Sequence, residues 1–282
     1  GGIAPPSCRR YIQIMTTVRP PAVAGAFYPR EAGELRSTVE DLLRGRAADE
    51  DRPAPKAVKA IIAPHAGYVY SGPIAGSAFR SLAGAAADIR RVVLVGPAHY
   101  VPIRGLALPG HHWFATPLGE VRVEPEGAQA ALRLPQVRVV PEAHAREHSL
   151  EVELPFLQAL LGEFDLVPLV AGDADGGEVA EVLERLWGGP ETLVVISSDL
   201  SHYLPYDAAL RADRETADEI LALGGPLHSR QACGSVPING LLEAARRRGL
   251  VPELLDLRNS ADTAGDPSRV VGYGAFAFHD RN

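Results

Sequence analysis

An apolar run, Val92-Val93-Leu94-Val95-Gly96-Pro97-Ala98-His99, has the composition of a buried strand and leads into a histidine. Two other runs do the same: Ile61-Ile62-Ala63-Pro64-His65 and Leu193-Val194-Val195-Ile196-Ser197-Ser198-Asp199-Leu200-Ser201-His202. Short Val- and Ile-rich runs that stop at Gly, Pro or Ser are typical of strands in a parallel sheet. Ligands of open α/β sheets bind outside the carboxyl ends of the strands. The three runs therefore predict a metal site, or a histidine-based catalytic site, at one edge of a sheet.

The rest of the chain continues this alternation of strand and helix patterns, which indicates βαβ units. We expect an α/β fold: a single domain with a largely parallel central sheet flanked by helices. We find no internal repeat and no linker that would indicate a second domain. The patterns predict strands over 58–63, 91–95, 164–170, 192–196, 251–257 and 270–278, shorter strands within 105–123, helices over 32–43, 73–82, 149–161, 178–187, 207–223 and 239–248, and a surface loop over 47–55.

Composition narrows the classes of function. The chain has 282 residues, 46% of them hydrophobic, and a formal net charge of -7. It has no run rich in Lys or Arg, so we expect no nucleic-acid partner. Two cysteines are too few for a disulfide framework, and no apolar stretch predicts a membrane span or signal peptide. We expect a cytoplasmic protein. Because the only methionine is Met15, we take residues 1–14 as a tag or upstream extension and 15–282 as the domain.

The histidines at the strand ends are the first candidates for chemistry. Either His65 or His99 alone could be a turn histidine that bonds to the backbone. Their equivalent positions after two strands favour shared ligation. In the third run, Asp199 could orient the imidazole of His202 or support a ligand, or it could cap a helix.

A second pattern, His144-Ala145-Arg146-Glu147-His148, matches the inverted zinc-protease motif H-x-x-E-H. That motif needs both histidines on one helical face. Pro141 and Ser149 argue against this, because Ser149 has the character of a helix N-cap. We therefore interpret Glu147, His148 and Glu151 as residues that line a pocket or support its ligands.

Cys233 is the only thiol after residue 14. It precedes a helix predicted to start near Pro237. A lone cysteine is usually a small buried hydrophobe, but a helix N-terminus suits a thiolate ligand or nucleophile. Position alone leaves both interpretations open.

At these same residues the sequence resembles the Memo family. The resemblance runs in family order from about Val18 to Phe278 and so covers nearly the whole chain. The matching segments are Ala24-Gly25-Ala26-Phe27-Tyr28-Pro29, Pro64-His65-Ala66-Gly67-Tyr68-Val69-Tyr70-Ser71-Gly72, Gly96-Pro97-Ala98-His99-Tyr100, Glu147-His148-Ser149-Leu150-Glu151-Val152-Glu153-Leu154-Pro155, Ser197-Ser198-Asp199-Leu200-Ser201-His202 and Cys233-Gly234.

The resemblance implies a fold similar to class III extradiol dioxygenases, which hold Fe(II) with two His and one Glu. It places the metal ligands at His65 and His99, with Cys233 in place of the carboxylate, and an acid–base histidine at His202. Fe(II) is the metal implied first, and Cu or Zn would also suit these ligands. The other pocket residues that we expect, together with Asp199, are Tyr68, Tyr100, Glu147, His148, Glu151 and Ser198.

Three functions remain open at this point. The first is a dioxygenase-like redox enzyme that depends on non-haem iron or copper and acts on a small molecule. The second is a binding or adaptor protein with a vestigial pocket. The third is a Cys-His hydrolase with Cys233 as nucleophile, oriented by His202 and Asp199. Bacterial Memo proteins are encoded with a radical-SAM protein and an AMMECR-type protein, so the resemblance implies these as partners. Animal members carry Arg-His after Cys-Gly, whereas Ser235-Val236 follow here.

Overall fold

A computed structural model describes residues 17–45 and 57–281 of the chain. The expected extension at 1–14 and the expected loop at 47–55 lie outside the described residues. The strands are β1 (Val18–Arg19), β2 (Val58–Ala63), β3 (Arg91–Pro97), β4 (Leu106–Leu108), β5 (Trp113–Thr116), β6 (Gly119–Val123), β7 (Val137–Val139), β8 (Asp165–Ala171), β9 (Thr192–Ser197), β10 (His202–Leu204), β11 (Val251–Asn259) and β12 (Val270–His279).

Eight α-helices and two short 3₁₀ helices join these strands in the described part of the chain. They are α1 (Ala32–Arg44), α2 (Tyr68–Arg80), α3 (Pro125–Leu132), α4 (Pro141–Ala145), η2 (Glu151–Glu153), α5 (Leu154–Leu161), α6 (Gly176–Leu186), α7 (Tyr206–Leu221), α8 (Ser235–Arg248) and η3 (Ser260–Asp262). No helix in this part is long and apolar enough to cross a membrane.

All the strands belong to one twelve-stranded sheet, with the principal order β1-β5-β6-β8-β3-β9-β2-β12-β10. Its centre is parallel, as predicted: β8, β3, β9 and β2 pair side by side in the same direction. The last two long strands differ, because β12 runs antiparallel to both β2 and β11. The fold is thus an α/β domain around a mixed, largely parallel sheet.

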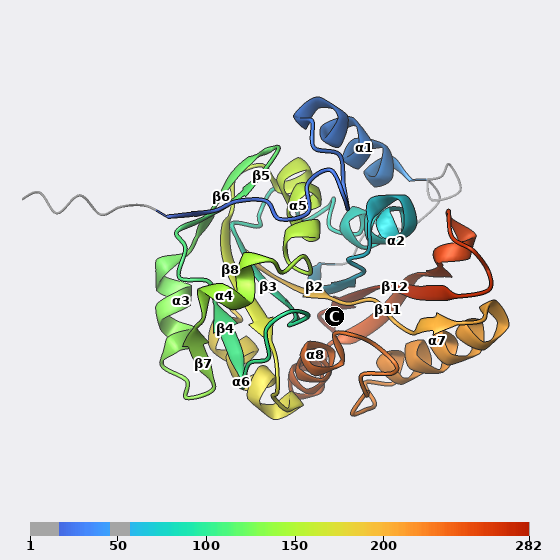
Figure 1. Cartoon of the computed structure of the whole chain (residues 1–282). Helices are drawn as coiled ribbons and strands as arrows, with labels where there is room; N and C mark the ends of the chain where they lie inside the picture. Colours follow the sequence, from blue (N-terminus) through green and yellow to red (C-terminus); the bar gives the residue numbers. More distant parts are fainter. Residues whose placement is uncertain (1–16, 46–56, 282) are drawn as a thin grey trace, which may run out of the picture.

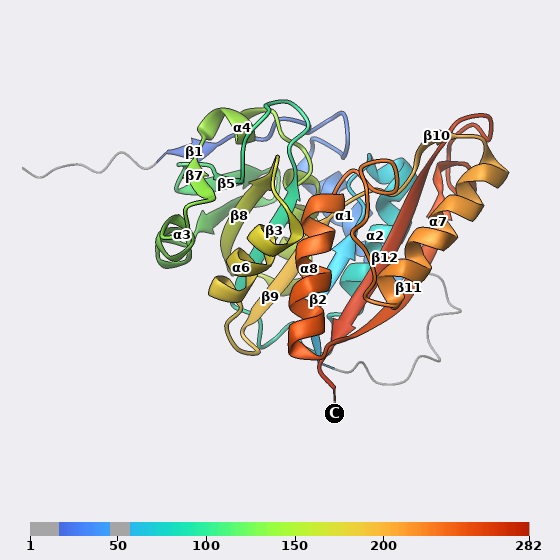
Figure 2. The same cartoon turned by 90° about the horizontal axis from the view of Figure 1, so that it is seen from below.

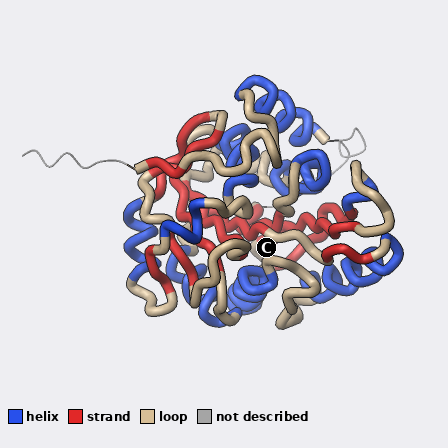
Figure 3. The backbone as a smooth tube through the Cα atoms, viewed as in Figure 1, coloured by secondary structure: helices blue, strands red, loops and turns tan. Residues whose placement is uncertain are grey.

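Helices cover both faces of this sheet. Successive side chains of a strand point to opposite faces, so Ile61 of β2 joins one core and Ile62 joins the other. The first core is closed by α1, α2 and α5, and the second by α6, α7 and α8. Figures 1 and 3 show these two helical layers with the strands between them, and Figure 2 shows α6, α7 and α8 from below. The central strands are buried on both sides, which explains their continuous apolar sequence.

Three predicted helices begin at clearly different residues in the structure, and one of them is α8, which begins at Ser235 where the prediction began at 239. Helix α2 begins at Tyr68, whereas the prediction began at Pro73, because the amide of Tyr68 donates to the carbonyl oxygen of Phe27 at 2.7 Å. This long-range partner satisfies an N–H group that a helix start leaves free. The helix predicted from Ser149 begins as η2, and α5 has Pro155 in its first turn, where a proline costs no hydrogen bond. Helices α3 and α4 and strands β1, β7 and β10 were not predicted.

The topology brings together the three runs that end in a histidine. Strands β3, β9 and β2 are parallel neighbours. Just past their last residues lie His99, Asp199 and His65 respectively. The carboxyl ends of parallel neighbours share one edge of the sheet, so these residues enter a common site.

Candidate metal centre

Three imidazole rings meet at this edge of the sheet. The ring centroids of His65 and His99 are 5.2 Å apart, those of His65 and His148 are 5.4 Å apart, and those of His99 and His148 are 4.6 Å apart. One nitrogen from each ring lies within 4.8 Å of the others. His65 is buried, His99 is exposed and His148 is partly exposed. This arrangement could hold a metal ion while leaving a side open to solvent.

A carboxylate orients the ring of His99. Glu147 accepts a hydrogen bond from His99 Nδ1 at 2.8 Å through Oε1, and one from the His99 backbone amide at 2.7 Å through Oε2. Burial opposes ionisation of Glu147, but its hydrogen bonds from His99 and Ser149 lower its pKa to about 2. An ionised acceptor places the proton on Nδ1 and leaves Nε2 of His99 free to bind a metal.

A serine orients the ring of His65. The Nδ1 atom of His65 lies 2.7 Å from Ser197 Oγ, which in turn lies 2.6 Å from the carbonyl oxygen of Ser149 and 2.7 Å from Glu153 Oε1. Burial raises the pKa of Glu153 well above its usual range, so this carboxyl can donate to the serine. The serine can then accept from His65 Nδ1, which frees Nε2 as a ligand atom.

His148 completes the cluster. Its ring packs against Phe27, with the centroids 4.7 Å apart. Its Nδ1 atom is buried and, apart from a 3.5 Å contact with Glu147 Oε1, has no hydrogen-bond partner. A buried nitrogen without a partner is costly. A metal ion among the three rings would bind imidazole nitrogens that have no other partner. The residues present therefore fit a bound metal.

Two of the imidazoles are also in the protonation state that binds a metal. Burial and the neighbouring His99 lower the pKa of His65 to about 3. Burial, with His65 and His99, lowers the pKa of His148 to about 4. Both rings are therefore neutral near pH 7, which is the form that binds metals.

Cys233 lies beside the cluster. Its Sγ atom is 3.3 Å from His65 Nε2 and accepts the backbone amide of Asp199 at 3.3 Å. Helix α8 begins at Ser235, so the thiol precedes a helix start as expected. Burial and the carboxylate of Asp199 nevertheless raise the pKa of Cys233 to about 12.

Asp199 and His202 have separate partners. The carboxylate of Asp199 accepts the backbone amide of His65 at 2.8 Å, which holds the chain after β2 and does not cap a helix. His202 is exposed, and its Nδ1 lies 2.8 Å from the carbonyl oxygen of Leu200. This contact leaves Nε2 of His202 available for proton exchange. The role of His202 as a catalytic acid or base stays a prediction.

Of the remaining predicted pocket residues, Tyr100 and Ser198 lie next to His148 and Cys233 respectively, whereas Tyr68 and Glu151 have buried partners elsewhere. Tyr100 is 45% exposed, and its ring centroid lies 6.0 Å from that of His148, at the solvent side of the cluster. Ser198 lies behind Cys233 and accepts the amide of Gly234 at 2.9 Å. Tyr68 and Glu151 are buried: the tyrosine donates to the carbonyl oxygen of Val152 at 2.7 Å, and Glu151 pairs with Arg19.

The structure does not assemble an inverted zinc-protease motif. Helix α4 ends at Ala145, so His144 and His148 do not share a helix. The ring of His144 is buried, and its Nε2 lies 2.8 Å from the carbonyl oxygen of Ala107.

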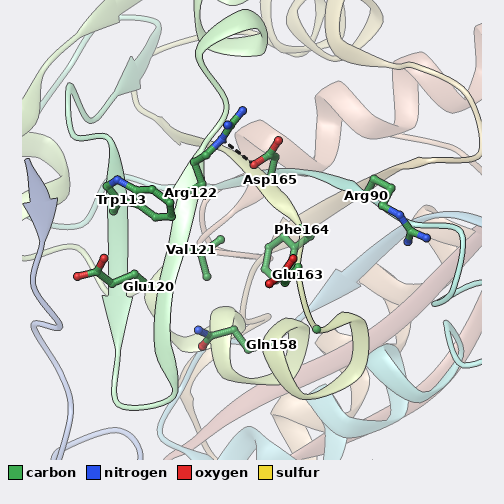
Figure 4. A pocket seen from close by; sticks show the side chains of 10 residues that line it. Arg90, Trp113, Glu120, Val121, Arg122, Gln158, Glu163, Phe164 and Asp165 are labelled. Atoms are coloured by element: carbon green, nitrogen blue, oxygen red, sulfur yellow. Dashed lines mark ion pairs between the residues drawn. The ribbon is translucent and has the colours of Figure 1, made fainter. Parts of the chain in front are cut away.

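A large cavity lies away from the histidines. It has a volume of roughly 460 Å³ and is lined by residues such as Arg90, Trp113, Gln158 and Phe164 (Figure 4). Arg90 precedes β3 and Phe164 precedes β8, so this cavity lies near the amino ends of strands whose carboxyl ends face the histidines. Size alone therefore does not locate the chemistry of this protein.

Sequence reasoning missed two residues that support the site. Ser197 lies in one of the three apolar runs, and Glu153 lies in a segment that matches the Memo family, but neither stood out as a site residue. The sequence pattern that could have indicated them is a polar residue among apolar neighbours. In the structure both side chains are fully buried, and buried polar groups need hydrogen-bond partners. Sequence alone gave no means of knowing that both residues would be buried.

Comparisons with known proteins agree with this architecture. The family model for Memo-like proteins matches residues 19–277. A MEMO1 family protein of Methanopyrus kandleri is 36% identical over 283 residues, covering 92% of this chain and 98% of the relative. One from Aeropyrum pernix is 37% identical, with the same coverage of both chains. The crystal structure of an uncharacterized Escherichia coli K12 protein aligns with a TM-score of 0.52 and 15% identity, over 78% of this chain and 99% of that one. That likeness supports the fold alone, whereas the family match and the relatives show that the chain belongs to the Memo-like protein family.

Proposed function

We propose that this protein is a metal-dependent redox enzyme that acts on a small organic substrate. The observation that carries the proposal is the cluster of His65, His99 and His148, in which two rings are oriented through Nδ1 by other side chains. Such orientation is the usual support of metal-binding histidines. The partly exposed side of the cluster would admit a substrate.

Cys233 would supply a further donor beside His65. Its thiol lies near a ligand nitrogen of that ring, and metal binding would displace the proton that burial otherwise retains. Imidazole and thiolate ligands suit iron and copper, and also zinc. Among these we propose Fe(II), which when bound would supply one-electron chemistry with O₂ or the substrate. This chain's own residues would orient the ligands, and His202 would hold or deliver a proton at Nε2.

The experiment is metal analysis of protein purified without oxygen, followed by reconstitution of the metal-free protein with Fe(II), Cu or Zn. We expect about one metal ion per chain, and its loss in His65→Ala. The matched control is His228→Ala, at an exposed histidine, which should keep the metal. Equal metal content in wild type and His65→Ala would overturn the proposal.

A second comparison addresses His202. His202→Ala should retain the metal, because this ring is not part of the cluster, while losing turnover once a substrate is found. Loss of the metal in His202→Ala would instead make this residue a ligand.

The two other functions are less well supported. A Cys-His hydrolase needs a thiolate nucleophile, whereas burial and Asp199 keep the thiol of Cys233 protonated near pH 7 in the metal-free protein. A purely binding protein would not need three imidazoles arranged around one point. The radical-SAM and AMMECR-type partners stay predictions, to be tested by co-purification.

A further inference from the structure

One short irregular segment carries one of the three histidines, orients a second and supports the serine that contacts the third. It is the connecting segment, residues 146–150, between α4 and η2. His148 belongs to it. Glu147 orients His99, and the carbonyl oxygen of Ser149 lies 2.6 Å from the serine hydroxyl that contacts His65. The geometry of the cluster therefore depends on how this segment is held.

A buried arginine far away in the sequence holds it. Arg19 in β1 is 1% exposed. Its Nε donates to the carbonyl oxygen of His144 at 3.1 Å, its Nη2 donates to that of Glu147 at 2.5 Å, and its Nη1 pairs with the carboxylate of Glu151. Its guanidinium carbon lies 5.3 Å from the ring centroid of Phe114. Arg19 thus binds the chain before, within and after the connecting segment.

The partner carboxylate is fully satisfied. Besides the arginine, Glu151 accepts the amide of Ala22 at 2.7 Å, the amide of Val23 at 3.0 Å and the hydroxyl of Tyr28 at 2.5 Å. A buried ion pair is retained only where such hydrogen bonds compensate both charges. The pair therefore ties residues 19–28 to the segment that carries the site.

We propose that Arg19 is a positioning residue of the metal centre, acting through the connecting segment without touching the cluster. This inference rests on the proposed metal-binding function and deepens it. The planar fork of an arginine reaches three acceptors at fixed angles, which a lysine ammonium cannot do. Arg19→Lys therefore keeps the positive charge but loses the planar group that reaches three acceptors at once.

The test compares Arg19→Lys with wild type using Co²⁺ as the probe metal. We expect Arg19→Lys to fold, to bind Co²⁺ roughly 10- to 100-fold more weakly, the usual effect of losing a residue that supports metal ligands, and to show an altered visible spectrum. Should Arg19→Lys fail to fold, Glu151→Gln, which keeps the side-chain shape, takes its place.

The matched control is Arg91→Lys. Arg91 starts β3 at the end remote from His99, and it likewise donates to a neighbouring side chain and a carbonyl oxygen, Thr192 Oγ1 and the backbone of Leu186, both at 3.0 Å. A comparable loss of melting temperature with unchanged Co²⁺ affinity and spectrum would show that general destabilisation does not explain the effect.

A second readout needs no metal. In the metal-free protein, amide hydrogen exchange at residues 147–149 should be faster in Arg19→Lys than in wild type or Arg91→Lys. If wild type binds no Co²⁺ but this difference appears, the proposed function fails, and what stands is that Arg19 holds the connecting segment in place. A folded Arg19→Lys with wild-type exchange, Co²⁺ affinity and spectrum would overturn the inference.

Discussion

Glu147 shows how much one residue contributes to this site. Its carboxylate binds the ring and the amide of His99 and also accepts the amides of His148 and Ser149 at 3.0 Å. It therefore fixes one imidazole and the backbone that carries another.

We predict that Glu147→Gln weakens metal binding about 10- to 100-fold, because a neutral amide no longer ensures the Nδ1–H form of His99. Titration of the metal-free protein with Zn²⁺ or Co²⁺ measures this. Glu142→Gln, at an exposed position of α4, should bind like wild type. Equal affinities in both variants would mean that Glu147 does not support a ligand.

The buried histidines also predict how stability depends on pH. Burial lowers the pKa of His144 from 6.5 to about 4. Between these values the unfolded chain binds a proton that the folded protein does not, so the free energy of unfolding falls as pH falls through this window. The slope from one such group is at most about 1.4 kcal/mol per pH unit.

His65 and His148 act in the same direction, since burial lowers the pKa of each. Burial raises the pKa of the Glu153 carboxyl, which therefore acts in the opposite direction. The test is thus the difference in slope between variants, measured by urea unfolding of the metal-free protein from about pH 6.5 to pH 4. His144→Gln can still donate to the carbonyl oxygen of Ala107, and it should reduce the slope. His228→Gln, at an exposed position, should not. An unchanged slope in His144→Gln would contradict the assignment.

At the scale of elements, the start of α8 packs tightly against the end of β9. A Cβ at Gly234 would lie 2.6 Å from Ser198 Cβ and 2.8 Å from the carbonyl oxygen of Ser197. Helix and strand can approach this closely only with glycine here. The approach places Cys233 beside His65.

Gly234→Ala should accordingly destabilise the protein by about 1–3 kcal/mol, the usual cost of overpacking, and weaken metal binding by displacing Cys233. Urea unfolding and Co²⁺ titration report the two effects. The control is Gly33→Ala in α1, where a Cβ would meet no atom within 4 Å and alanine should stabilise the helix by up to about 1 kcal/mol. Wild-type behaviour of Gly234→Ala would refute this account of the packing.

At the scale of the molecule, the proposed ligands come from four separate parts of the chain: the ends of β2 and β3, the connecting segment, and Cys233 just before α8. A metal that binds them only in the folded state stabilises that state. At a free metal concentration of a hundred times the dissociation constant, the free energy of unfolding rises by about 2.7 kcal/mol.

For a domain of this size that gain corresponds to a rise in melting temperature of roughly 5–10 °C. Thermal unfolding with Co²⁺ and with a chelator measures the difference. His65→Ala should show no rise. A rise that survives in His65→Ala would place the binding site elsewhere.

The class of the fold and two of the proposed ligands, His65 and His99, could be predicted from the order of the amino acids. Short apolar runs of Val and Ile that stop at Gly, Pro or Ser indicate strands buried on both faces. Neighbouring parallel strands end at one edge of a sheet, so the strand-end positions of His65 and His99 were enough to pair them. The family resemblance added the expectation of Cys233, which lies next to His65.

The remaining features became visible once the elements were packed together. The tertiary structure placed His148 in the cluster, made β12 antiparallel and started α2 at Tyr68. It also revealed Arg19, a single arginine with no motif around it. These features depend on hydrogen bonds and packing between residues far apart in the chain, such as Arg19 with Glu151 and Tyr68 with Phe27. Local periodicity reports which face of an element is apolar, but which distant group meets a buried polar atom is settled only when the elements pack.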